Sequence, residues 1–181
     1  MSKKFILRIL DQRFLTEDFT DVCSHGPIYL KVNDTVISDE DDGDWVINEA
    51  ALSLMRTVKY GFPNETPPRY YPEGLSEDAL INCCGAFMLF CPSNIRWNVE
   101  IKGDHVCLSN FIKHETIEYT GLQVTLPLRN YALEIYHFAT EARKLFEGIQ
   151  VDTEGWEHFE GQYKQFWNEY DELYRYIEKM I

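Results

Sequence analysis

The sequence predicts an α+β fold, in which an antiparallel sheet built from N-terminal and central strands is covered by helices. Short runs of branched apolar residues with turn residues between them recur in the first two thirds of the chain, and two long stretches of helical periodicity occupy the last third. Strands and helices do not alternate, which excludes a parallel βαβ sheet. Because 45% of the 181 residues are hydrophobic, we expect a single globular domain over residues 1–181.

The predicted strands are a first single strand, two hairpins and a final single strand. FILRIL and PIYLKV are dense in branched apolar side chains, and Asn33-Asp34 supplies a turn after the second of them. Gly103-Asp104 supplies the turn of the second hairpin, after WNVEI. Strands are therefore expected at residues 5–10, 27–32, 35–37, 97–101, 105–111 and 124–126. The apolar segment 79–91, with three cysteines, is expected to be largely buried.

Helices are expected where apolar residues recur three and four positions apart, which is the case in residues 47–60, 128–149 and 156–177. Asp44 is a candidate cap for the first helix and Asp152 for the last, because carboxylates at a helix N-terminus meet unpaired backbone N–H groups. The proline-rich residues 61–74 are expected to form an irregular surface loop. The two long C-terminal helices complete the predicted fold.

Charge limits the classes of partner. Seventeen Lys and Arg against thirty Asp and Glu give a formal net charge of −13. A field of this sign repels phosphate backbones, so we expect no nucleic-acid binding; the excess charge serves either solubility or a basic protein partner. The sequence shows no secretory signal and no apolar run of membrane-spanning length, and its five cysteines do not suit a secreted disulfide scaffold. A cytoplasmic protein with reduced thiols and no membrane association is expected.

The stretch SDEDDGDWVINEA, residues 38–50, concentrates acidic side chains. Aligned with a twelve-residue calcium loop, it places Gly43 at the sharp turn and Glu49 at the bidentate position. The alignment fails because Ser38 lacks the carboxylate that heads such a loop, and because a strand rather than a helix is expected before it. Two interpretations remain, a solvated turn into a helix or an acidic contact surface. The residues of that surface would be Asp39, Glu40, Asp41, Asp42 and Asp44.

Cysteine and histidine offer an alternative function. Cys23, His25, Cys83 and Cys84 have side chains that bind zinc or support thiol catalysis, with His25 as a base, if the fold brings them together. Their spacing matches no common zinc motif, and the apolar surroundings of Cys83 and Cys84 favour core packing. The chain also has no glycine-rich phosphate loop, nucleophile elbow or zinc-protease motif. We therefore expect a protein that is not an enzyme and that has no cofactor.

The last predicted helix is rich in aromatic and acidic residues. Its rings can pack in the core, but Trp and Tyr beside carboxylates also suit a surface that binds arginine or lysine through ion pairs and cation–π contacts. Trp167, Tyr170 and Asp171 are the predicted partner-binding residues of this segment.

Four stretches, CSHGPIYLKV, DDGDWVINEAALSLMRTV, INCCG and FWNEY, resemble those of small acidic bacterial proteins, some of which are similar to immunity proteins encoded beside secreted toxins. The resemblance implies a non-catalytic, stoichiometric inhibitor of a basic partner such as a toxin nuclease, which electrostatic steering would favour. The alternatives are the zinc or thiol enzyme and a structural or regulatory protein with another partner. The sequence does not predict the oligomeric state.

Overall fold

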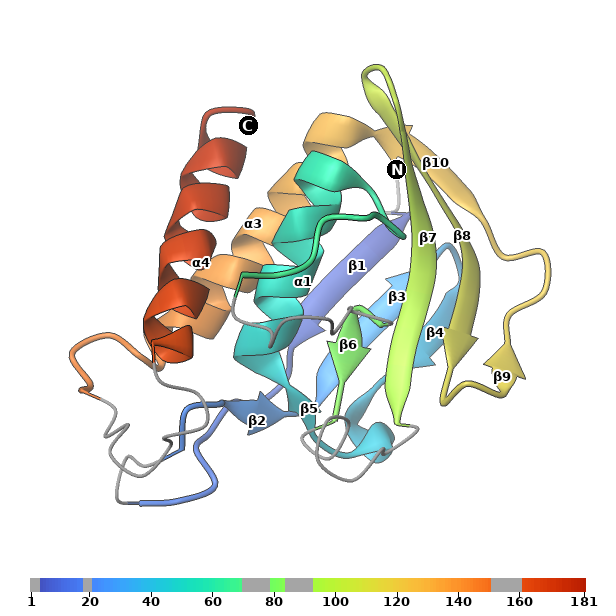
Figure 1. The fold of residues 1–181 in the computed structure, drawn as a ribbon. Helices are drawn as coiled ribbons and strands as arrows, with labels where there is room; N and C mark the ends of the chain where they lie inside the picture. The colour runs from blue at the N-terminus through green and yellow to red at the C-terminus, as the bar shows by residue number, and fades with distance from the viewer. Residues whose placement is uncertain (1–3, 18–20, 70–78, 84–92, 151–160) are drawn as a thin grey trace.

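The computed structural model describes residues 4–17, 21–69, 79–83, 93–150 and 161–181, and it shows an α+β fold. The helices of the described residues lie on one side of the molecule and the strands on the other (Figure 1). The helices are α1 (Ile47–Tyr60), α3 (Leu128–Lys144) and α4 (Gln162–Glu178). The predicted α+β class, with antiparallel strands and two C-terminal helices, is confirmed.

The strands form two main antiparallel sheets. The first has the order β1-β3-β4, and the second has the order β10-β8-β7-β6, with β9 also paired to β8. A small third sheet pairs β2 with β5. The bounds are β1 (Phe5–Ile9), β2 (His25–Gly26), β3 (Ile28–Val32), β4 (Thr35–Ser38), β5 (Trp45–Val46), β6 (Ile81–Asn82), β7 (Asn94–Lys102), β8 (His105–Lys113), β9 (Ile117–Glu118) and β10 (Val124–Pro127).

Both predicted hairpins are present. Asn33 adopts a left-handed backbone in the β3–β4 turn, and Gly103 does so in the β7–β8 turn, as tight turns of this kind require. β7 and β8 are longer than predicted because inward and outward side chains alternate along nearly all of both strands. Gly61 lets the chain after α1 lie close to β7, where Phe62 pairs with Val99. A Cβ at position 61 would lie 2.7 Å from the Val99 carbonyl oxygen, which is too close for a side chain.

The helix α1 lies at the centre of the structure. It contacts both α3 and α4 as well as the short strands β2, β5 and β6. Almost every side chain from Ile47 to Val58 is therefore buried. One hydrophobic cluster joins α1 to both main sheets and to the other two helices, and its largest fully buried side chains include Trp45, Trp97, Phe111, Tyr131 and Tyr170.

Some predicted features differ in the structure. The helix predicted over 128–149 ends at Lys144, because the chain turns through Leu145–Gly148 and Gly148 has a left-handed backbone that does not continue a helix. Asp44 does not cap α1: the N-cap is Val46, which makes no side-chain cap, and Asp44 instead pairs with Arg13 at 2.6 Å. Residues 84–91, Asp152 and the predicted helix start at 156–160 lie outside the described residues.

Candidate partner-binding pocket

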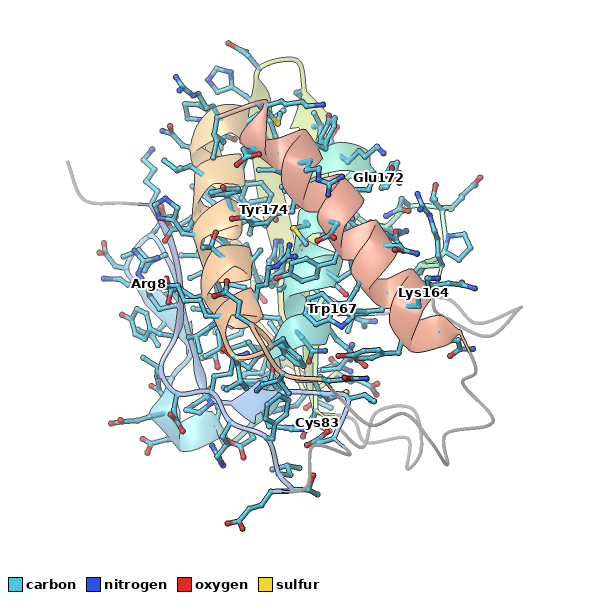
Figure 2. The ribbon with its side chains drawn as sticks, turned by 90° about the vertical axis from the view of Figure 1, so that its left-hand side faces the viewer. Arg8, Cys83, Lys164, Trp167, Glu172 and Tyr174 are labelled. Carbon is cyan, nitrogen blue, oxygen red and sulfur yellow. The ribbon has the colours of Figure 1, made fainter. Side chains whose placement is uncertain are left out.

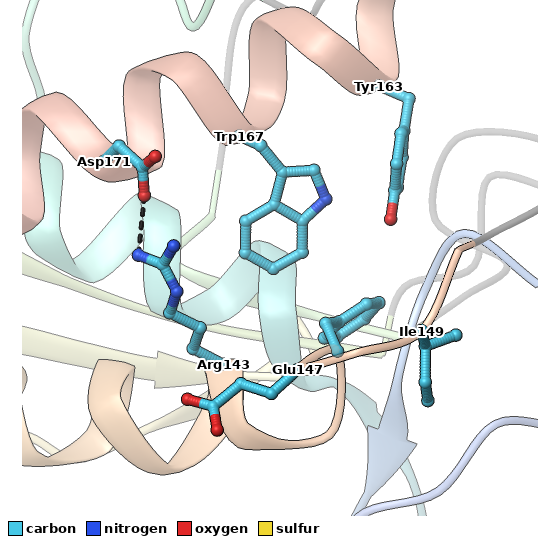
Figure 3. Close-up of a pocket in the computed structure, with 7 residues that line it drawn as sticks. Arg143, Glu147, Ile149, Tyr163, Trp167 and Asp171 are labelled. Carbon is cyan, nitrogen blue, oxygen red and sulfur yellow. Dashed lines mark hydrogen bonds and ion pairs between the residues drawn. The ribbon is translucent and has the colours of Figure 1, made fainter.

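A pocket of about 230 Å³ lies where the end of α3 and the following turn meet the first half of α4 (Figure 3). We call it the α3–α4 pocket. Its walls combine aromatic rings with charged groups. The lining residues are Arg143, Phe146, Glu147, Ile149, Tyr163, Trp167 and Asp171.

Trp167 forms the central wall of this pocket. Its indole meets the Phe146 ring edge-to-face at 4.9 Å between centroids and the Tyr163 ring at 6.3 Å. Two buried rings, Phe166 and Tyr170, pack against it at 5.1 and 5.0 Å. Figure 2 shows Trp167 and Tyr174 between α3 and α4, whereas Lys164 and Glu172 lie on the outer side of α4. The indole is therefore held in place by the core while part of it remains open to the pocket.

The charged groups of the pocket come from both helices. The Arg143 guanidinium donates to Asp171 Oδ1 at 2.6 Å and lies 6.0 Å from the centroid of the Tyr174 ring. Glu147 is exposed, and among the described residues it takes part in none of the ion pairs. Burial raises the pKa of the Tyr163 hydroxyl, and the hydrogen bond with Trp167 opposes that shift. The pocket therefore offers ring surfaces, one paired carboxylate and one carboxylate that forms no ion pair within the described part of the chain.

The three residues predicted in α4 have different places. Trp167 and Asp171 both line the pocket. Tyr170 is fully buried, and its hydroxyl donates to the Ala139 carbonyl oxygen at 2.7 Å. Tyr170 is therefore a core residue rather than part of the contact surface, because its side chain is directed to α3, where it bonds to Ala139. The reasoning from sequence missed Arg143, Glu147 and the roles of Phe146 and Tyr163, although Tyr163, Trp167 and Asp171 are spaced four apart and so share one helix face.

The acidic segment is a structured turn. Residues Glu40–Asp42 form a short 3-10 helix, η1, in which Asp39 accepts from the Asp41 backbone N–H and Asp42 accepts from the Asp39 backbone N–H. The buried Lys113 ammonium donates to Asp42 and to the Ile37 carbonyl oxygen. Although burial opposes ionisation of Asp42, the bond from Lys113 lowers the pKa of its carboxyl below the ordinary value.

Only part of the predicted acidic surface is therefore open to a partner. Asp42 pairs with Lys113 and Asp44 pairs with Arg13, whereas Glu40 and Asp41 are exposed and form none of the ion pairs among the described residues. The calcium alignment also finds no support in this geometry. Ser38 is buried and accepts from the Trp45 indole N–H, and Glu49 is directed to Cys23.

The cysteine and histidine candidates form separate contacts. The Cys23 thiol donates to Glu49 Oε1 at 3.7 Å, and His25 Nε2 lies 3.3 Å from Asp21 Oδ2. A carboxylate beside a thiol does not provide the electropositive surroundings that activate cysteines. The Cys83 backbone N–H donates to the Ser93 carbonyl oxygen, and Cys84 lies outside the described residues. In the described part of the chain, no group of three or more His, Cys, Asp or Glu could hold a metal ion.

A second hollow, of about 660 Å³, is lined by residues of β7 and β8, by Glu118 of β9 and by the segments 62–63 and 119–123. Amide, hydroxyl and aromatic side chains share its walls, with Arg96 and Glu118 as its charged groups. Its lining does not favour one sign of charge. It includes none of the predicted site residues.

Comparisons with protein-family models, with curated proteins and with solved structures find no match to this chain. In the described residues, no helix is both long and apolar enough to cross a membrane.

Proposed function

We propose that this protein is a non-catalytic binding module for a basic protein partner, and that it acts as an immunity-type inhibitor of a toxin such as a basic nuclease. The observation that carries the proposal is the α3–α4 pocket, in which aromatic rings and carboxylates meet at the surface of a chain with a net charge of −13. Rings and carboxylates together bind lysine and arginine side chains through cation–π contacts and ion pairs.

The charge of the whole molecule supports the same partner class. An acidic protein attracts a basic partner over distances of about a Debye length, which raises the rate at which the two meet. The exposed carboxylates of Glu40 and Asp41 add to this field. An inhibitor of this type needs no catalytic group, because covering the toxin's basic cleft stops its activity.

The proposal is tested with each basic protein that the flanking genes encode, as a candidate partner. Its binding to the purified protein is measured by calorimetry between 0.05 and 0.5 M NaCl. We expect a stoichiometric complex whose affinity falls about tenfold or more over this range. The double variant Glu40→Gln/Asp41→Asn is expected to bind a few times more slowly at low salt.

A matched control removes two charges at the opposite end of the molecule. Glu100→Gln/Asp104→Asn lies at the β7–β8 turn, which projects away from η1 (Figure 1), and should leave the association rate close to that of the parent. A complex whose affinity does not change with salt, or the absence of any complex, would contradict the proposed function.

A further inference from the structure

We infer that the α3–α4 pocket binds an arginine side chain of the partner, with Trp167 as the stacking surface and Glu147 as the pairing carboxylate. This inference rests on the proposed function and adds the chemistry that the pocket selects. It is drawn from three features of the pocket: a guanidinium already bound in its wall, a ring surface held in place, and a carboxylate that forms no ion pair with a described residue.

The first feature is Arg143. Its guanidinium lies between the Asp171 carboxylate, at 2.6 Å, and the Tyr174 ring, at 6.0 Å from the centroid. The interface of α3 and α4 therefore already binds one guanidinium through a carboxylate and a ring. The same pocket, whose wall includes the Arg143–Asp171 pair, presents a second ring in Trp167 and a second carboxylate in Glu147.

The second feature is the indole of Trp167. Phe146, Phe166 and Tyr170 all pack against it, with ring centroids 4.9, 5.1 and 5.0 Å from its own, so its position is set before any ligand binds. A pre-positioned ring loses little conformational freedom on binding, which favours affinity. In the close-up, Trp167 stands between Tyr163 on one side and the Arg143–Asp171 pair on the other (Figure 3).

The third feature is the exposed carboxylate of Glu147, which forms no ion pair with any of the described residues. The neighbouring carboxylate of Asp171 is already paired, so an incoming cation has Glu147 as its ion partner. The pocket volume of about 230 Å³ exceeds that of several water molecules, each of which takes about 30 Å³ in the liquid. A side chain can therefore enter the pocket rather than only lie across its mouth.

Arginine suits this arrangement better than lysine. The guanidinium is planar, stacks on aromatic faces and is more weakly hydrated than an ammonium group, so it loses less on leaving water. It can also form two parallel hydrogen bonds with one carboxylate. Lysine offers a compact charge that keeps the ion pair but makes poor use of the flat indole.

The experiment compares three labelled peptides that alternate glycine with arginine, lysine or neutral citrulline. Binding to the intact protein is measured by fluorescence anisotropy at low salt. We expect the arginine peptide to bind roughly fivefold or more tightly than the lysine peptide, and the citrulline peptide to bind least. Trp167→Leu should remove the preference for arginine, and Glu147→Gln should weaken both charged peptides.

Two controls keep the outcomes separate. Glu100→Gln makes the same charge change as Glu147→Gln on β7, far from the pocket lining, and should bind all three peptides like the parent. Glu147 is exposed, so its variant tests the pocket even if Trp167→Leu fails to fold. Equal binding of the arginine and lysine peptides, with no effect of either pocket variant, would overturn the inference and leave the proposed function standing. If neither charged peptide binds, the inference is overturned, and the proposed function still depends on the titration with the protein partner described above.

Discussion

Glu49 is a carboxyl group whose ionisation the fold alters strongly. It lies in the first turn of α1, and its carboxylate accepts from the Cys23 thiol at 3.7 Å. Burial raises the pKa of Glu49 from 4.5 to about 7, and the bond from Cys23 acts in the opposite direction. The folded protein therefore keeps a proton on Glu49 at pH values where the unfolded chain has lost it.

The direction of the resulting pH dependence follows from this difference in proton binding. Below pH 4.5 the group is protonated in both states, so its full stabilising contribution is present. As the pH rises through about 7, the folded state must also ionise and the contribution is lost. The free energy of unfolding should fall by up to roughly 3 kcal/mol between pH 5 and 8, as measured by urea unfolding.

Glu49→Gln should flatten this part of the pH profile, because glutamine is neutral throughout. Glu65→Gln, an exposed residue in the loop after α1, serves as the control and should keep the parent profile. If Glu49→Gln retains the same fall in stability, another group is responsible for it.

Among the helices and strands, α1 and α4 are joined by a buried ion pair. Arg56 and Glu169 are each only 3% exposed at the side chain, and the guanidinium donates to the carboxylate. Glu169 also accepts from the Arg69 backbone N–H at 2.9 Å, and Arg56 donates to the Thr66 carbonyl oxygen. The pair thus holds the loop after α1 against both helices.

Removing one member of this pair should be costly. Glu169→Ala leaves the Arg56 charge buried without its carboxylate, and we expect a loss of about 3–5 kcal/mol in the free energy of unfolding, measured in urea. Glu172→Ala is the matched control, one turn along the same helix. It removes exposed pairs with Lys59 and Arg69 and should cost no more than about 1 kcal/mol. Similar losses for the two variants would show that burial does not govern the cost.

The same elements show what sequence patterns can predict. The bounds of α1 match the predicted residues 47–60, because a periodic apolar pattern there coincides with burial and ends at Gly61. The sequence did not predict β2, β5, β6 and β9, since a strand of two residues is too short for any alternation and is defined by its distant partner. The end of α3 was misplaced because Phe146 and Ile149 continue the apolar spacing into a turn.

The candidate site was predictable only in part for a related reason. Composition pointed to Trp167 and Asp171 in α4, but the pocket exists because the turn after α3 packs against that helix. Glu147 and Arg143 join the site through this packing, which periodicity within one helix cannot show. Tyr170 illustrates the converse: aromatic residues of α4 look alike in sequence, and only the position of α3 and α1 decides which are buried.

For the whole molecule, the dominant feature is the excess of acidic side chains. Two like charges 10 Å apart repel by about 0.4 kcal/mol in water, and salt screens this repulsion over a Debye length of about 10 Å at 0.1 M. A compact chain with a net charge of −13 holds many such pairs closer together than the unfolded chain does. Internal pairs such as Lys113–Asp42 relieve only part of the repulsion.

Added salt should therefore stabilise the fold and weaken the proposed complex. We expect the free energy of unfolding to rise by on the order of 1 kcal/mol between 0.01 and 0.5 M NaCl, because screening relieves the repulsion between carboxylates. Over the same range, affinity for a basic partner should fall, because screening removes the attraction between the two proteins. Urea unfolding and calorimetry in the same buffers measure the two effects. If salt raises the free energy of unfolding and lowers the affinity for the partner, the excess charge serves partner binding at the expense of stability. If salt instead destabilises the fold, favourable ion pairs outweigh the net repulsion.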